Sequence, residues 1–124
     1  MATSSRNRHV LEQMFGADSF QSPEFEYELR ADDFVAEIPQ SGERFESREA
    51  LRAMQEGFGD PPTIQLKRIT GEGDTWVVEA IQTYGDASIF HVCALVEFTD
   101  GKISRETRYY APPLAADRPR VPAE

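Results

Sequence analysis

The sequence predicts an α+β fold, because helix-like patterns fill its first half and turn-separated strands fill its second half. Apolar residues recur at helical spacing within Arg6–Phe15 and again from Leu51 to Phe58. From Thr63 onward, apolar and polar side chains alternate in runs that short turns rich in Gly and Asp separate. Helices grouped apart from an antiparallel set of strands are typical of this fold class.

Three helices are expected in the first half of the chain. The first spans Arg6–Phe15 and ends at Gly16. The second begins at Ser22 or Pro23 and runs to Arg30, since proline is favoured at the first position of a helix. The third follows Ser47, which can cap its N-terminus, places Ala50, Leu51, Met54 and Phe58 on one buried stripe, and ends at the breaker 59–62.

The expected strands form a short hairpin and a longer meander. The hairpin pairs Phe34–Ile38, which Pro39 stops, with Arg44–Glu46. The meander has strands at Thr63–Thr70, Thr75–Tyr84 and Ile89–Phe98, and a last strand that follows the Asp100-Gly101 turn and ends at Tyr110. Residues from about 111 to 124 contain four prolines and no periodicity, so we expect an extended tail on a single domain spanning 1–124.

Composition limits the possible partners. With 22 acidic and 13 basic residues, the chain of 124 residues has a formal charge of −9, which repels phosphate backbones and anionic lipids. We therefore expect no nucleic-acid partner and no membrane partner. No run has transmembrane length and the N-terminus lacks a signal-peptide pattern, which favours a cytoplasmic location. Cys93 is alone, so we expect no disulfide, no metal site and no cofactor.

The last expected strand carries an arginine on each of its two faces. Strict alternation places Arg105 with Ile103, Thr107 and Tyr109, and places Arg108 with Ser104, Glu106 and Tyr110. If either face lies inside the fold, a charged side chain is buried and needs a partner. This strand is therefore the first candidate for a functional site.

The order of these elements resembles the SnoaL-like branch of the nuclear transport factor 2 (NTF2)-like superfamily. The resemblance extends from about Val10 to Tyr110, and its motifs are Asp32-Asp33-Phe34, Arg48-Glu49-Ala50-Leu51 and the hairpin Phe98-Thr99-Asp100-Gly101-Lys102-Ile103. It implies a cone, in which a strongly curved antiparallel sheet and about three helices enclose a pocket for a small, mostly apolar molecule. Members include polyketide cyclases, ketosteroid isomerases, limonene epoxide hydrolases and non-catalytic domains, so the fold alone leaves the function open.

The resemblance also implies a set of site residues. In cyclase- and epoxide-hydrolase-like members the last strand resembles Trp-Asp-x-Tyr/Phe, with the Asp facing the pocket, and alignment on Gly101-Lys102-Ile103 places Arg108 at that position. The candidate catalytic residues are Arg108, Glu79 and Glu106. The candidate ligand-binding residues are Glu37, Tyr110, Phe90, Val92, Val35, Ile81 and Tyr27, with core packing as the alternative role of Tyr27.

Two interpretations of this constellation remain open. In the first, Arg108 holds a carboxylate or another oxygen of a small hydrophobic ligand, and a desolvated glutamate with a raised pKa exchanges protons in a cyclase, isomerase, lyase or hydrolase. In the second, a Glu79–Arg108 or Glu106–Arg108 ion pair is purely structural, and the protein is a non-catalytic binding or assembly module.

A homodimer is the other expected partner. Ile89, His91, Cys93 and Leu95 alternate with Phe90, Val92 and Ala94, which assigns His91 and Cys93 to the outer face of the sheet. The resemblance implies that this outer face is the dimer surface, and we expect Trp76 on the same side or as a core anchor. His91 is therefore expected at an interface rather than in catalysis.

Overall fold

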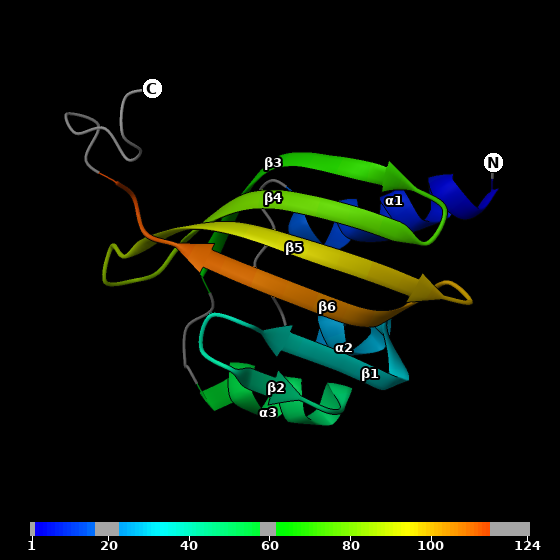
Figure 1. Cartoon of the computed structure of the whole chain (residues 1–124), viewed down its shortest axis with the longest axis horizontal. Coiled ribbons are helices and arrows are strands. Elements are labelled where there is room, and N and C mark those ends of the chain that lie inside the picture. Colours follow the sequence, from blue (N-terminus) through cyan, green and yellow to red (C-terminus); the bar gives the residue numbers. More distant parts are fainter. Residues whose placement is uncertain (1, 17–22, 58–61, 115–124) are drawn as a thin grey trace, which may run out of the picture.

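The computed structural model describes residues 2–16, 23–57 and 62–114, which form one curved six-stranded sheet with helices along one side (Figure 1). The elements in chain order are α1 (Ala2–Phe15), α2 (Pro23–Leu29), β1 (Arg30–Ile38), β2 (Glu43–Phe45), α3 (Arg48–Gly57), β3 (Thr63–Glu72), β4 (Thr75–Thr83), β5 (Ile89–Thr99) and β6 (Lys102–Ala111). The expected α+β fold is confirmed. Residues 115–124 of the expected tail lie outside the described residues.

The third helix begins where the sequence predicts. The Ser47 side chain accepts a hydrogen bond of 3.0 Å from the backbone N–H of Ala50, which satisfies one of the free donors of the first helical turn. Leu51 is buried, as its place in the apolar stripe predicts, whereas Ala50 is exposed and does not belong to that stripe. Phe58, the last expected member of the stripe, lies outside the described residues.

The sheet has the strand order β2-β1-β6-β5-β4-β3. All neighbouring strands are antiparallel except β1 and β6, which run parallel. Strand β1 begins at Arg30, before the expected start at Phe34, so Arg30 belongs to the sheet rather than to the second helix. This early start carries the Arg30 side chain into the interior.

A β-bulge sets the two faces of β6. Phe98 pairs with Ile103 but Glu97 pairs with Arg105, so Ser104 is an extra residue without an opposite partner. Ile103 and Glu106 are consequently both fully buried. The expected placement of Ile103 on the same face as Arg105 is wrong, because strict alternation does not hold across the bulge.

The core lies between the sheet and α1. Leu11, Met14 and Phe15 are fully buried and pack with apolar side chains from the inner face of the sheet. Trp76 belongs to this core at 3% exposure, and its Nε1 donates to the carbonyl of Gly73 at 2.9 Å. Of the two expected positions of Trp76, the core is therefore confirmed and the outer face of the sheet is wrong. None of the described helices is both long and apolar enough to span a membrane.

Candidate functional site

Four charged side chains are buried on the inner side of the sheet. Glu26 comes from α2, Arg30 from the first position of β1, and Glu106 and Arg108 from β6. Their exposure is 1%, 1%, 0% and 5%, respectively. Because burying an unpaired charge is costly, their partners decide what this cluster can do.

The four side chains form one continuous network. Arg30 lies between the two carboxylates, donating from Nη2 to Glu26 Oε1 at 3.0 Å and from Nε to Glu106 Oε2 at 3.1 Å. Arg108 Nε donates to the other oxygen of Glu106 at 2.8 Å. From α3, Gln55 Nε2 donates to Glu26 Oε1 at 3.0 Å. The network therefore connects both helices of the α2–α3 pair to the middle of the sheet.

These contacts keep Glu106 and Arg108 ionised. Burial alone would raise the pKa of Glu106, but the positive charges of Arg108 and Arg30 and their hydrogen bonds lower it to about 2. Burial works against the charge of Arg108, yet Glu106 and Tyr110 keep its pKa well above the usual value. For Glu106, the expected raised pKa is wrong, because two guanidinium groups outweigh desolvation. Glu106 therefore cannot exchange a proton near neutral pH.

Aromatic side chains lie beside Arg108, near the ends of the strands. Arg108 Nη1 donates to the Tyr110 hydroxyl at 3.3 Å. The ring of Phe90 lies edge-on to both Tyr110 and Tyr84, with centroids 6.5 and 6.0 Å apart. Burial raises the pKa of Tyr84, so its hydroxyl stays protonated and donates to Gln82 Oε1 at 3.0 Å. All three residues are only partly buried although they belong to the inner face.

Some polar atoms of the site have no hydrogen-bond partner within the described structure. These atoms are Glu26 Oε2, Gln55 Oε1 and Arg108 Nη2. Arg108 Nη2 lies 2.6 Å from Glu106 Oε1 as an ion pair, but its N–H groups do not make a hydrogen bond there. An unsatisfied buried polar group costs about 1–3 kcal/mol. The site thus has one donor and two acceptors available for another molecule.

The structure brings five of the expected site residues together on the inner face: Arg108, Glu106, Tyr110, Phe90 and Val92. It places Glu37, Glu79, Val35 and Ile81 on the outer face, so their expected inward orientation is wrong. The physical reason is that these residues alternate with buried neighbours on the same strands, such as Ala36 and Ala80. Glu37 pairs with Arg105 and Arg44, and Glu79 pairs with Arg68, so neither glutamate reaches Arg108.

Tyr27 lies between two helices rather than in the network. Its hydroxyl donates to Glu49 at 2.6 Å, and the guanidinium group of Arg48 stacks over its ring at 4.1 Å. Both partners belong to α3. Tyr27 therefore joins α2 to α3, and it supports the network only through the position of the helices.

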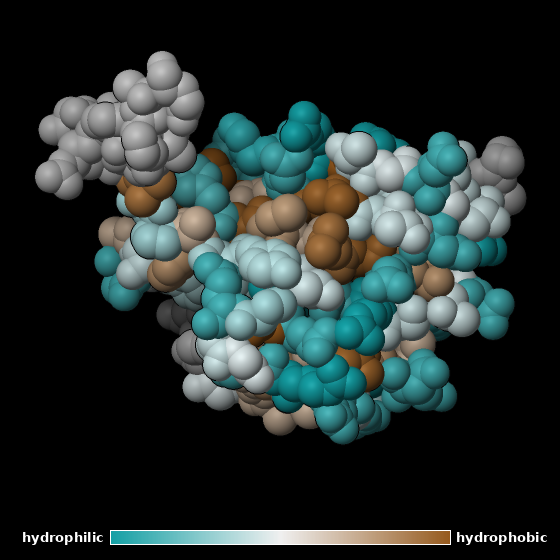
Figure 2. Space-filling view, in the orientation of Figure 1, coloured by the Kyte–Doolittle hydropathy of each residue, from teal (hydrophilic) through white to brown (hydrophobic). Residues whose placement is uncertain are grey.

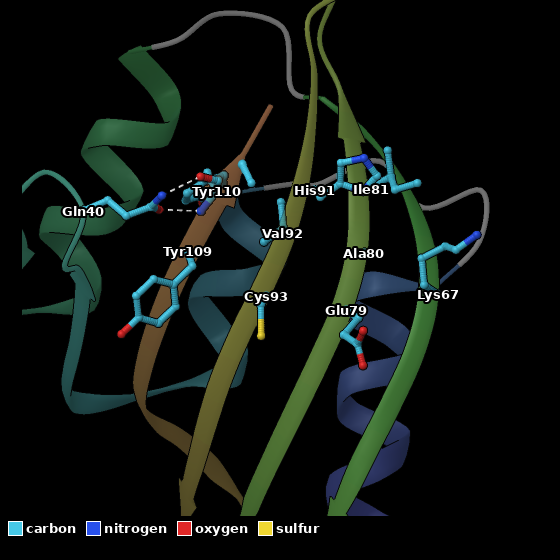
Figure 3. Close-up of a pocket in the computed structure, with 11 residues that line it drawn as sticks. Gln40, Lys67, Glu79, Ala80, Ile81, His91, Val92, Cys93, Tyr109 and Tyr110 are labelled. Atoms are coloured by element: carbon cyan, nitrogen blue, oxygen red, sulfur yellow. Dashed lines mark hydrogen bonds between the residues drawn. The ribbon is translucent and has the colours of Figure 1, made fainter. Parts of the chain in front are cut away.

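A groove of about 490 Å³ opens on the opposite, outer face of the sheet (Figure 3). Its side chains include Lys67, Glu79, Ile81, His91, Cys93 and Tyr109. His91 and Cys93 lie on the outer face, as their alternation with Phe90 and Val92 predicts. Gln40 closes one side of the groove through two hydrogen bonds to the backbone of Tyr110. Val92 and Tyr110, which belong to the inner face, also border this groove.

The sequence interpretation missed five members of the inner site: Glu26, Arg30, Gln55, Gln82 and Tyr84. One signal was present, because Glu26 and Arg30 have the i,i+4 spacing of a helical ion pair. Their burial depends on the early start of β1, which the sequence pattern did not indicate. Gln82 and Tyr84 follow from the alternation of β4 once Val78 and Ala80 are known to face inward.

The fold and the site together define an α+β protein whose curved sheet carries a buried network of charged side chains on its inner face. Residues 11–106 match the SnoaL-like domain family, and the chain belongs to this family within the NTF2-like superfamily. No curated protein matches it.

Several solved structures are similar to this chain. An NTF-2 like protein of unknown function from Burkholderia xenovorans LB400 is 30% identical, with 90% of this chain and 88% of that chain covered and a TM-score of 0.80. A "putative ketosteroid isomerase" from Kribbella flavida DSM 17836 is 25% identical over 98% and 93% of the two chains, with a TM-score of 0.76. An LEH-like epoxide hydrolase of M. tuberculosis, at 19% identity, 86% and 84% coverage and a TM-score of 0.67, shows the shared fold alone.

Proposed function

We propose that the protein binds a small, mostly apolar molecule in the interior of the cone and holds one oxygen atom of that molecule at Arg108 and Tyr110. The observation that carries this proposal is Nη2 of Arg108, a buried donor on a permanently charged group that is ion-paired with Glu106 but makes no hydrogen bond. Half-exposed aromatic rings lie directly beside it, and they offer apolar contact to the rest of the ligand. An oxygen at Nη2 would remove the cost of the unmade hydrogen bond.

Any catalysis at this site depends on hydrogen-bond donation rather than on proton exchange by Glu106. A carboxylate with a pKa of about 2 is a poor base and is never protonated near neutral pH. Arg108 and the Tyr110 hydroxyl can instead stabilise negative charge that develops on a ligand oxygen, as an isomerase, lyase or hydrolase requires. The name of one similar protein, a putative ketosteroid isomerase, is compatible with such chemistry.

A pair of neighbouring tyrosines provides the test of this proposal. Tyr110 lies on the inner face beside Arg108, whereas Tyr109 lies on the outer face and is 40% exposed. We expect the Tyr110→Phe variant to bind benzylacetone, a small aromatic ketone, about five- to tenfold more weakly in an NMR titration, because one hydrogen bond is lost. The Tyr109→Phe variant should bind it as the wild type does. Equal affinities for all three proteins would refute the assignment of the site.

A second function, assembly into a homodimer, is favoured by the outer face of the sheet. Apolar side chains gather there over β4 and β5 with polar side chains around them (Figure 2), and Ile89, Leu95 and Tyr109 are exposed. The flanking charges are largely paired within the chain, as in Glu79–Arg68 and Glu37–Arg105. A chain with a formal charge of −9 repels its own copies, so a face with paired charges is the most favourable place for two copies to meet.

Light scattering tests the assembly. We expect a mass of twice the 14.0 kDa chain at micromolar concentration, with His91 and Cys93 in the interface. Leu95→Asp places a charge in the centre of the face and should give a monomer. Leu114→Asp changes an exposed leucine outside the sheet and should leave the dimer intact. A monomeric wild-type protein would exclude this second function.

A further inference from the structure

The buried network is electrically balanced, and this balance limits the charge of any ligand. Glu26 and Glu106 contribute two formal negative charges, and Arg30 and Arg108 contribute two formal positive charges. Each carboxylate is already paired with at least one guanidinium group. A ligand that brings its own charge into this interior would leave one charge without a counterpart among the described groups of the network.

A carboxylate ligand would have to compete with Glu106 for Arg108. Glu106 accepts hydrogen bonds from Arg30 and Arg108 through its two oxygens, so it is held on both sides. Its lowered pKa means that it does not take up a proton to make room for a second anion. Displacing it would break one buried ion pair to form another, and the interior would still carry an extra negative charge.

The buried polar atoms that make no hydrogen bond also favour a neutral ligand. Arg108 Nη2 is ion-paired with Glu106 but makes no hydrogen bond, and a ketone or ester carbonyl supplies an acceptor without adding charge. Glu26 Oε2 and Gln55 Oε1 need donors, and a carboxylate ligand has none to offer them. Glu26 also adds negative charge within electrostatic reach of Arg108, which disfavours a second anion there.

Building on the proposed function, we infer that the ligand is a neutral carbonyl compound and that the site discriminates against carboxylates of the same shape. The carbonyl oxygen accepts a hydrogen bond from Arg108 Nη2 while the Glu106–Arg108 pair stays intact. A hydroxyl group elsewhere on the ligand would strengthen binding by donating to Glu26 or Gln55. The charge balance of the network, rather than the positive charge of Arg108 alone, sets this preference.

Matched pairs of ligands test this inference. A methyl ketone and a carboxylate on the same skeleton have nearly the same shape, as in benzylacetone with hydrocinnamate and methyl nonyl ketone with decanoate. In NMR titrations of the full chain at pH 7, we expect each ketone to bind at least about tenfold more tightly than its carboxylate. A carboxylate that binds within tenfold of its ketone overturns the inference and leaves the proposed function in place. Failure of all four compounds to bind overturns the proposed function itself.

The Glu106→Gln variant gives a second, independent test of the ligand preference. It removes one negative charge from the network and leaves the interior with an excess positive charge. If the variant folds, the preference should reverse, so that hydrocinnamate binds more tightly than benzylacetone. An unchanged preference in the folded variant contradicts the argument from charge balance. If the variant does not fold, the affinities of the wild-type protein for the two ketone–carboxylate pairs test the inference alone.

Discussion

Replacing Glu106 with Gln should destabilise the protein strongly at neutral pH, because two buried guanidinium groups lose their shared carboxylate. The carboxylate has a pKa of about 2 in the folded protein, against an ordinary value of 4.5. A shift of this size corresponds to roughly 3 kcal/mol of folding free energy. Removing one partner of a buried ion pair typically costs about 3–5 kcal/mol, which agrees with this magnitude. Such a loss is a large share of the 5–15 kcal/mol that is typical of a small domain.

The pH dependence of this loss follows from the direction of the shift. Because the pKa of Glu106 is lower in the folded state, its stabilising contribution is fully present above the unfolded value of 4.5. The contribution decreases as the pH falls from 4.5 toward 2, where the folded protein also takes up the proton. The difference in unfolding free energy between wild type and variant should therefore be largest at pH 5–7 and much smaller at pH 3.

Urea unfolding measures this difference at each pH. The unfolding is followed by the fluorescence of Trp76, which is the only tryptophan in the sequence and is buried. The matched control is Glu79→Gln, which breaks the outer-face pair with Arg68. The Arg68 side chain is largely exposed and that of Glu79 partly exposed, so the change should lower the unfolding free energy by at most about 1 kcal/mol. A loss for Glu106→Gln that matches the control, or one that stays constant between pH 7 and pH 3, would refute the reasoning.

Two further predictions concern a turn and a helix cap, and the same unfolding assay tests both. Gly71→Ala should lower the free energy of unfolding by roughly 2–3 kcal/mol, because the φ of Gly71 is 149° and the new methyl carbon would lie 2.4 Å from a backbone carbonyl oxygen. Gly73→Ala, with φ at 63° and open space around it, should cost only about 1 kcal/mol; equal costs would contradict the steric argument. Ser47→Ala should cost about 1 kcal/mol through the lost cap of α3. Ser47→Asp should retain the stability, and a loss as large as that of Ser47→Ala would argue against the cap.

Local patterns in the sequence predicted most of the fold. Turn residues and alternation located the meander, and the cap at Ser47 located the start of α3. The start of β1 at Arg30 was missed, because the four residues before Phe34 are polar or small and give no strand pattern. Arg30 joins the sheet through its parallel pairing with Ile103 in β6. That contact spans most of the chain and cannot be inferred from neighbouring residues.

The candidate site was predictable only in part for a similar reason. Alternation divides a strand into two faces but does not say which face is inside. On β4, Val77 and Ile81 are as apolar as Val78 and Ala80, so the sequence alone could not exclude an inward Glu79. For β6, the resemblance to the family placed Glu106 and Arg108 inward. The partners of this pair, Glu26 on α2 and Arg30 on β1, could be identified only from the folded structure.

The central claim is that a neutral ligand oxygen meets Arg108 while Glu106 stays paired, and a crystal structure with benzylacetone bound at saturating concentration tests it most directly. We expect the carbonyl oxygen within hydrogen-bond distance of Arg108 Nη2 and the Tyr110 hydroxyl, with the Glu106–Arg108 pair unbroken. Benzylacetone seated in the outer groove, or at the inner site with Arg108 turned away from Glu106, would contradict the claim.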